Sequence, residues 1–130
     1  MLSQTRTFVR YCAAALTVWA AIAYAAPAAA PVRAEIEALL SKLETAGCQF
    51  NRNGSWYSGA QAKTHLLRKL EYIESHGTVQ STEQFIDLAA SRSSSSGKAY
   101  QVKCGSEAPL ESGIWLKQKL ASVRAEKAAR

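Results

Sequence analysis

The sequence lacks the glycine-rich motifs of the two most common nucleotide-binding folds. Neither the Rossmann spacing nor the P-loop spacing occurs among its seven glycines, which excludes these two ways of binding a nucleotide. No segment recurs with a period of about 20–50 residues, which excludes a solenoid. Charged residues make up 20% of the chain, a fraction that excludes both a disordered polyelectrolyte and a protein with several membrane spans. At 130 residues, the chain has room for one domain.

The sequence also has few residues of the kinds that bind metals or nucleic acids. The two histidines, His65 and His76, are far apart in the chain, and there is neither an H-E-x-x-H motif nor a cluster of cysteines and histidines. We therefore expect no metal and no other cofactor. The cations form no basic cluster and the aromatic residues form no RNA-recognition pattern, so we expect no nucleic-acid partner. The net positive charge instead favours anionic surfaces such as lipid headgroups or cell-wall polymers.

The N-terminus has the three parts of a secretory signal peptide. A start with two arginines and no acid is followed by an uncharged, alanine-rich stretch over residues 11–23 and by the small-x-small site Ala23-Tyr24-Ala25. We predict that residues 1–25 are a signal peptide cleaved near Ala25, so that the protein is periplasmic or secreted and keeps no stable membrane span. The alternative is an uncleaved anchor, because the uncharged stretch continues to residue 32, although two prolines interrupt it.

Cleavage would leave an Ala/Pro tether over residues 26–32 and a single domain over residues 33–130. The mature chain would have a net charge of +4, since two arginines belong to the signal peptide. It would keep two cysteines, Cys48 and Cys104, and an exported protein lies in an oxidising compartment. We predict one disulfide between them, which would stabilise the fold by ~4 kcal/mol in the chain-entropy model. An intermolecular bridge and a metal site with a histidine are the alternatives, and the residue spacing favours neither.

Four helices are expected from the apolar spacing. The first covers residues 33–46, the second residues 59–75, the third begins after Ser81, and the last follows Ser112 or Gly113. The charged, alanine-rich residues 124–130 at the end of the last helix are expected to fray. Ser58 with Gln61, and Ser81 with Gln84, have the spacing of capping boxes.

Three short strands complete the expected fold. Residues 48–50 and 55–57 are rich in strand-forming residues and flank Asn53-Gly54, a strong signal for a two-residue hairpin turn. The polar segment 91–98 is expected to be a flexible loop, and residues 99–104 alternate as a half-buried strand does. A Cys48–Cys104 bridge would place this strand beside the hairpin. The predicted fold class is α+β, with about four helices and a small antiparallel sheet.

Four short blocks of residues follow one another along the predicted domain. They are Cys48-x-Phe50-x-Arg52-Asn53-Gly54-x-x-Tyr57, Ala62-x-x-His65-Leu66-x-x-Lys69, Ser93-Ser94-x-Ser96-Gly97-x-x-Tyr100-x-Val102-x-Cys104 and Trp115-Leu116-x-x-x-Leu120. Together they resemble the YfeK-like family of small exported bacterial proteins of unknown function, over residues 36–120. The resemblance implies export and a single small domain, and it implies no activity.

Several of these residues are candidates for binding. Arg52 lies beside the hairpin turn, which does not itself require an arginine, and a guanidinium can bind an anion or a carboxylate. The structural explanation is an ion pair within the protein or a solvated tip of the turn. His65 and Lys69 are four residues apart and share a helix face; a histidine at the edge of the core, and a lysine paired with nearby glutamates, are the structural explanations. The candidate binding residues are Arg52, Asn53, His65, Lys69, Ser94, Ser96, Gly97 and Tyr100.

Segment 93–97 is the second candidate feature. A serine-rich turn that ends in glycine can present several backbone N–H groups to an anion, and Arg52 would complete such a site if the hairpin tip lies nearby. A plain linker is the alternative. Ser96-Gly97-x-x-Tyr100 also looks like the S-G-x-x-Y segment of periplasmic lysozyme inhibitors, whose loop enters the lysozyme cleft. Those inhibitors are β-barrels, however, and a cationic protein is a poor match for a cationic lysozyme.

The sequence contains no complete set of catalytic residues. Ser96 with His65 is a possible hydrolase pair, but there is no nucleophile-elbow motif and no carboxylate placed to orient His65. Our leading hypothesis is therefore a non-enzymatic, exported binding module whose partner is a periplasmic protein or an anionic ligand. A small Ser/His hydrolase and a lysozyme-inhibitor-like protein are the alternatives.

Overall fold

The computed structural model describes residues 28–130. The predicted signal peptide, its cleavage site and the start of the predicted tether lie outside the described residues. Within residues 28–130, no helix has both the length and the apolar character needed to cross a membrane.

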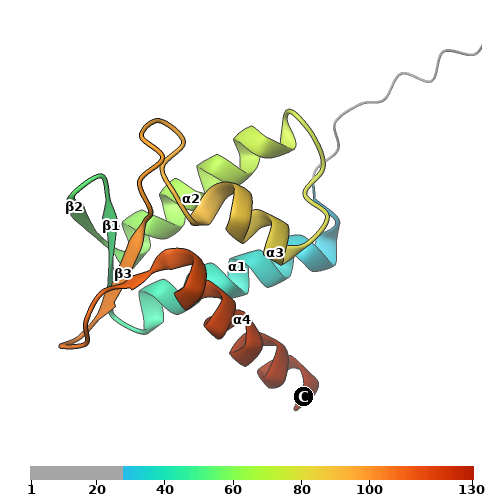
Figure 1. The fold of residues 1–130 in the computed structure, drawn as a ribbon. Coiled ribbons are helices and arrows are strands. Elements are labelled where there is room, and N and C mark those ends of the chain that lie inside the picture. Colours follow the sequence, from blue (N-terminus) through green and yellow to red (C-terminus); the bar gives the residue numbers. More distant parts are fainter. Residues whose placement is uncertain (1–27) are drawn as a thin grey trace, which may run out of the picture.

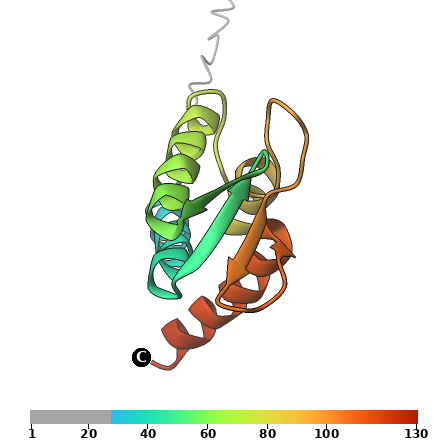
Figure 2. The same cartoon turned by 90° about the vertical axis from the view of Figure 1, so that its left-hand side faces the viewer.

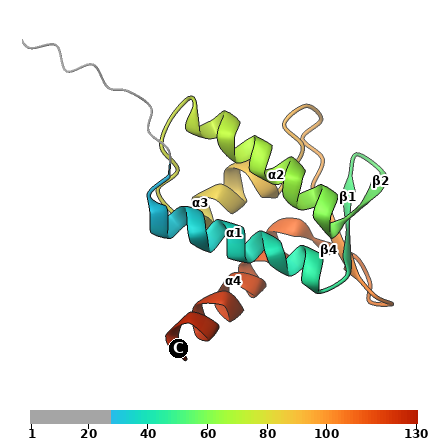
Figure 3. The ribbon, with the colours of Figure 1, turned by 180° about the vertical axis from the view of Figure 1, so that it is seen from behind.

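The described chain is an α+β domain, as predicted, in which a small sheet lies at one end of the helices (Figure 1). Seen from behind, α1 and α2 run side by side and α4 crosses below them (Figure 3). The helices are α1 (Ala30–Thr45), α2 (Gly59–Glu74), α3 (Thr82–Phe85) with its π-helical continuation η1 (Ile86–Ala90), and α4 (Ser112–Ala128). The strands are β1 (Cys48–Arg52), β2 (Ser55–Ser58), β3 (Gln101–Cys104) and β4 (Leu110–Glu111).

The sheet is antiparallel throughout, in the order β2-β1-β3-β4. The predicted hairpin is confirmed, and its turn has positive φ at Asn53 (53°) and Gly54 (87°), the conformation that favours Asn-Gly. The predicted third strand is also confirmed, over a shorter range, beside β1. Strand β4 was not predicted, because two residues are too few to form a periodic pattern.

The predicted disulfide is present between Cys48 and Cys104, with an S–S distance of 2.05 Å. The two cysteines are directly opposed on β1 and β3. The bridge therefore joins the hairpin to a strand whose cysteine lies 56 residues further along the chain.

One apolar core holds the helices and the inner face of the sheet together. Gly59, at the start of α2, is buried against the backbone of α1, where an added Cβ would lie 2.1 Å from the carbonyl oxygen of Leu43. Because this distance is far below van der Waals contact, only glycine permits the two helices to approach so closely. Fully buried apolar side chains come from every layer: Ile36, Leu39, Leu40, Leu43, Phe50, Leu66, Leu70, Phe85, Ile86, Val102 and Leu116.

The ends of two helices differ from the predictions. Helix α1 begins at Ala30, so the last part of the predicted tether is helical; Pro31 occupies the first turn, where its missing N–H costs nothing. Helix α4 continues to Ala128, although its last residues were expected to fray. There, Arg124 forms ion pairs with Glu35 and Glu83, which tie the end of the helix to α1 and α3.

Only one of the two predicted capping boxes is complete. The Ser58 hydroxyl accepts the backbone N–H of Gln61 at 3.1 Å, and the Gln61 side chain accepts that of Ser58 at 2.9 Å. Ser81 caps α3 in the same way, at 3.1 Å from the amide of Gln84. The side chain of Gln84, however, accepts the N–H of Gln80 at 2.7 Å, so the second box is half formed.

Candidate functional site

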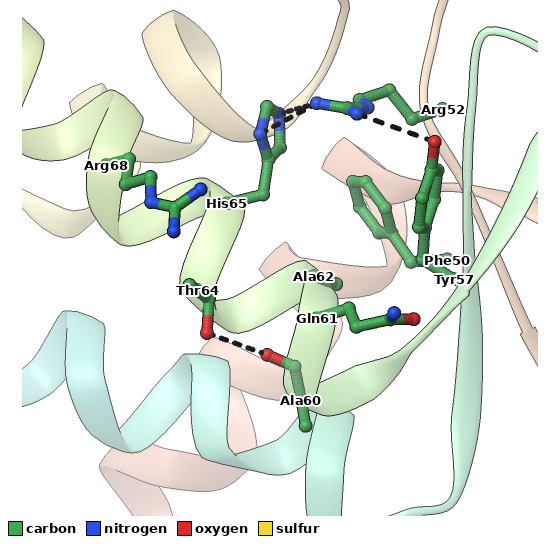
Figure 4. Close-up of a pocket in the computed structure, with 9 residues that line it drawn as sticks. All are labelled: Phe50, Arg52, Tyr57, Ala60, Gln61, Ala62, Thr64, His65 and Arg68. Carbon is green, nitrogen blue, oxygen red and sulfur yellow. Dashed lines mark hydrogen bonds between the residues drawn. The ribbon is translucent and has the colours of Figure 1, made fainter.

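Alternation along the hairpin places three side chains on the face of the sheet that α2 covers. Phe50 and Arg52 are two residues apart on β1, and Tyr57 on β2 is directly opposite Phe50. Between them and α2 lies a pocket of about 430 Å³ (Figure 4). Its lining comprises Phe50, Arg52, Tyr57, Ala60, Gln61, Ala62, Thr64, His65 and Arg68. We call this space the hairpin pocket.

The guanidinium of Arg52 lies between His65 and Tyr57 (Figure 4). Its Nη1 is 2.9 Å from Nδ1 of His65, its Nη2 is 3.4 Å from the Tyr57 hydroxyl, and its carbon lies 5.0 Å from the centre of the Tyr57 ring. Arginine can only donate, and Nη1 is also 3.4 Å from Nε2 of His65, so we assign the tautomer from the shorter contact: Nδ1 accepts, and the proton of the neutral ring is on Nε2. That nitrogen lies 3.3 Å from the Tyr100 hydroxyl, to which it donates.

This environment keeps His65 neutral. Its pKa is lowered to about 4, mainly by burial and in addition by the charges of Arg52, Lys69 and Arg68. Protonation would also place a hydrogen on Nδ1, facing the guanidinium of Arg52, and would break that hydrogen bond. The hydrogen bond from Arg52 lowers the pKa of the Tyr57 hydroxyl as well.

Lys69 is held by groups other than the glutamates expected from the sequence. Its Nζ donates to the Tyr100 hydroxyl at 3.1 Å and to the backbone oxygen of Arg92 at 3.0 Å. Glu74, one of the expected partners, instead pairs with Arg33 at 3.2 Å. Burial and the charge of Arg52 lower the pKa of Lys69. Both predicted residues of this helix face are therefore part of one network around the hydroxyl of Tyr100.

No carboxylate balances the charge of this network within residues 28–130. The ion pairs of that part of the chain all lie elsewhere, and none includes Arg52, Arg68 or Lys69. None of the residues that line the hairpin pocket is acidic either. Three cations thus surround a neutral histidine at a concave surface, an arrangement that favours a bound anion.

The serine-rich segment is ordered by its own hydrogen bonds and by the hairpin tip, whereas a flexible loop was expected. Asn53 donates to the Ser93 hydroxyl at 3.2 Å and accepts from the Ser96 hydroxyl at 2.6 Å. Figure 2 shows the tip of the β1–β2 hairpin directed toward this loop. Ser93 is accordingly buried, although it lies in the most polar stretch of the sequence.

Four backbone N–H groups of this loop, for which an anion nest was predicted, already have acceptors within the loop. The N–H groups of Ser93 and Gly97 donate to the carbonyl oxygens of Lys98 and Ser93, and those of Ser96 and Lys98 donate to serine hydroxyls. These amides are therefore already satisfied. Nor does Arg52 complete a site here, since its contacts are with His65 and Tyr57.

Comparison with known protein families gives one match, over residues 30–124, to a family of unknown function, DUF5329. The match covers most of the chain. The protein belongs to the DUF5329 family. No curated protein and no solved structure is significantly similar to it. Membership agrees with the expectation of an uncharacterised family, while the finer resemblance to YfeK-like proteins stays a prediction.

In this DUF5329 protein, seven of the eight predicted binding residues form two groups. Arg52, His65, Lys69 and Tyr100 lie together beside the hairpin pocket, and Asn53, Ser96 and Gly97 belong to the contact between the hairpin tip and the loop. Ser94 lines a second groove, which His65 and Arg68 also line. Tyr100 is only 2% exposed and packs against Phe50, with ring centres 4.9 Å apart.

The proposed hydrolase pair is not assembled. Ser96 donates to Asn53, and the ring of His65 contacts Arg52 and Tyr100; among the described residues, no hydrogen bond joins Ser96 to His65. Sequence reasoning missed Tyr57 and Arg68. Both could have been found from the sequence: a two-residue turn places Tyr57 on the same face of the hairpin as Arg52, and Arg68 is one helical turn beyond His65.

Proposed function

We propose that this protein is an exported, non-enzymatic binding protein that holds an anionic group in the hairpin pocket. The observation that carries the proposal is the convergence of Arg52, Arg68 and Lys69 on neutral His65, while none of the three forms an ion pair with a carboxylate of the described chain. Buried and half-buried cations are normally paired, so an unpaired cluster at a pocket is a candidate anion site.

Arg52 is the principal anion-binding residue in this proposal. A guanidinium has five N–H donors in one plane, and the contacts with His65 and Tyr57 use only part of them. Those contacts also fix the side chain before a ligand arrives, which reduces the entropy lost on binding. Arg68, which is exposed at the rim, would steer the anion toward the pocket.

Export is supported by the N-terminal sequence pattern and by the disulfide. Disulfides persist in oxidising compartments such as the periplasm and are rare in the cytosol. The binding role is favoured over an enzymatic one because the site contains donors and a neutral histidine but lacks a paired nucleophile and base.

The proposal is tested by NMR titration of the protein with acetate and with inorganic phosphate. We expect the resonances of the Arg52 and His65 side chains to shift saturably, and we expect the pKa of His65 to rise when the anion is bound, because a nearby negative charge favours the protonated ring. Arg52→Gln should weaken binding about tenfold or more, since it removes a charged hydrogen bond.

Lys103→Gln is the matched control. Lys103 is opposite Gln49 on the other face of the sheet, so this variant removes the same charge at a distance from the pocket. Equal losses of affinity in Arg52→Gln and Lys103→Gln would show that anions bind only to the net positive charge, and would overturn the proposal.

A further inference from the structure

A second depression continues from the hairpin pocket along α2. It has a volume of about 710 Å³ and lies between the second half of α2, the segment that follows it, and η1. His65 and Arg68 line both spaces, so the two meet at the cationic cluster. Helices α2 and η1, which form its walls, are adjacent in the fold (Figure 1). We call this second space the α2 groove.

The α2 groove exposes apolar side chains. Tyr72, on α2, is 68% exposed and Leu88, on η1, is 54% exposed. Both line the groove, together with the half-buried Ile73. They are two of the four large apolar side chains that residues 28–130 leave exposed. An apolar surface next to unpaired charge is a feature of binding sites.

The charge around the two spaces has one sign. No aspartate or glutamate lines either the hairpin pocket or the α2 groove. Each of the other three depressions described on this domain has at least one acidic residue in its lining. The cationic end and the apolar end of this surface therefore form one amphipathic track.

We propose that the ligand of this track is a single-chain amphiphile, with its anionic headgroup in the hairpin pocket and its alkyl chain in the α2 groove. The inference rests on the proposed function, because Arg52 and Arg68, the cations that line the hairpin pocket, also hold the headgroup. The inference adds the chemical class of the natural ligand, which the binding of small anions such as acetate would not reveal.

Two other occupants fit the track less well. An extended peptide needs backbone groups with which to pair, whereas the walls of the α2 groove are helical and use their own N–H and C=O groups internally. A second copy of the chain, docked by two-fold symmetry, would bring Arg68 and Lys69 of each copy toward the same residues of the other. An alkyl chain with one negative end needs neither backbone partners nor opposite charges along its length.

The experiment measures the affinity of straight-chain carboxylates from acetate to dodecanoate, and of the matching alkyl phosphates from inorganic phosphate upward, below their critical micelle concentrations. We expect affinity to rise about two- to fourfold per methylene while the chain fills the groove, because moving each methylene from water into an apolar groove contributes favourable free energy. A stronger carboxylate series would identify a fatty acid as the source, and a stronger phosphate series would identify a lipid phosphate.

Leu88→Ser is the test variant and Ile114→Ser is its control. Both side chains are large, apolar and exposed, but Ile114 is on α4 and does not line the groove. Leu88→Ser should reduce the gain per methylene and leave acetate binding unchanged, whereas Ile114→Ser should change neither. Thermal melts would verify that both variants are folded.

The possible failures can be distinguished. If acetate and dodecanoate bind equally well, the amphiphile proposal is wrong and the anion pocket stands. If no member of either series binds, both proposals are wrong. If Ile114→Ser weakens the binding of dodecanoate as much as Leu88→Ser does, the alkyl chain binds to the protein without a defined site. If the free protein dimerises and Leu88→Ser makes it monomeric, a second copy covers the groove and the proposal is overturned.

Discussion

Acidification should destabilise this protein through His65. In the native state, the pKa of His65 is lowered to about 4 by burial and by the surrounding cations, whereas an unfolded histidine titrates near 6.5. Between these two values, the unfolded chain binds more protons than the native one. The free energy of unfolding therefore decreases as the pH falls through this window, and the loss is complete below about pH 4.

The size of the effect follows from the difference in pKa. A lowering of about 2.5 units corresponds to roughly 3 kcal/mol for a fully buried group. His65 is only partly buried, so solvent screening reduces this to about 1–2 kcal/mol. The groups that oppose its protonation are Arg52 on β1 and Arg68 and Lys69 on α2. The Tyr100 hydroxyl faces the ring from the segment before β3.

The assay is urea unfolding of the wild type and of His65→Gln at several pH values between 7 and 4. Other groups, such as Glu35, whose pKa is lowered by Arg124, also respond to acid, but their contribution cancels between the two proteins. We expect the stability advantage of the wild type to shrink by about 1–2 kcal/mol over this range. His76→Gln, at an exposed position, is the control and should keep the wild-type pH dependence.

An NMR titration of the His65 ring measures directly the lowered pKa that causes this pH dependence. A midpoint near 6.5, or equal pH dependence in the wild type and His65→Gln, would refute the reasoning.

Three further predictions concern stability and are tested by denaturant unfolding. Gly59→Ala should lower the free energy of unfolding by about 3 kcal/mol, because the added Cβ would overlap the backbone of α1. Gly77→Ala is the control; it has open space around its Cα and should change stability by less than about 1 kcal/mol. Equal effects of the two substitutions would contradict the argument that α1 and α2 approach closely at Gly59. Replacing both Cys48 and Cys104 by serine should cost about 4 kcal/mol, and an unchanged midpoint would show that the bridge contributes nothing. Ser58→Ala should cost about 1 kcal/mol, since it removes the cap of α2, and a neutral result would show that water replaces that hydrogen bond.

Local patterns were sufficient to predict most of the elements. Asn53-Gly54 specified the hairpin turn, the spacing of apolar residues specified the long helices, and the even number of cysteines outside the predicted signal peptide specified the disulfide. Each of these signals acts over a few residues or, for Cys48 and Cys104, depends on redox chemistry rather than on packing. The errors lie where packing decides: β4 is too short to have a pattern, and α4 is extended by ion pairs with helices distant in sequence.

The candidate site was predicted as a list of residues and not as an arrangement. Arg52, His65 and Lys69 were named, but the sequence indicated nearby glutamates as partners of Lys69 and the loop at residues 93–97 as the neighbour of Arg52. The network is instead centred on Tyr100, more than thirty residues beyond His65 and Lys69. The serine-rich segment was expected to be flexible because its composition is polar. Its order comes from a long-range contact with Asn53, which composition cannot reveal.

The covalent bond between β1 and β3 has a consequence for ligand binding as well as for stability. Side chains on a strand change faces with every residue, so a slip of one position between the two strands would turn Arg52 away from α2. The bridge prevents that slip by fixing the pair Cys48 and Cys104. Reducing agents should therefore weaken the proposed anion binding, which would make that binding depend on the redox state of the surroundings.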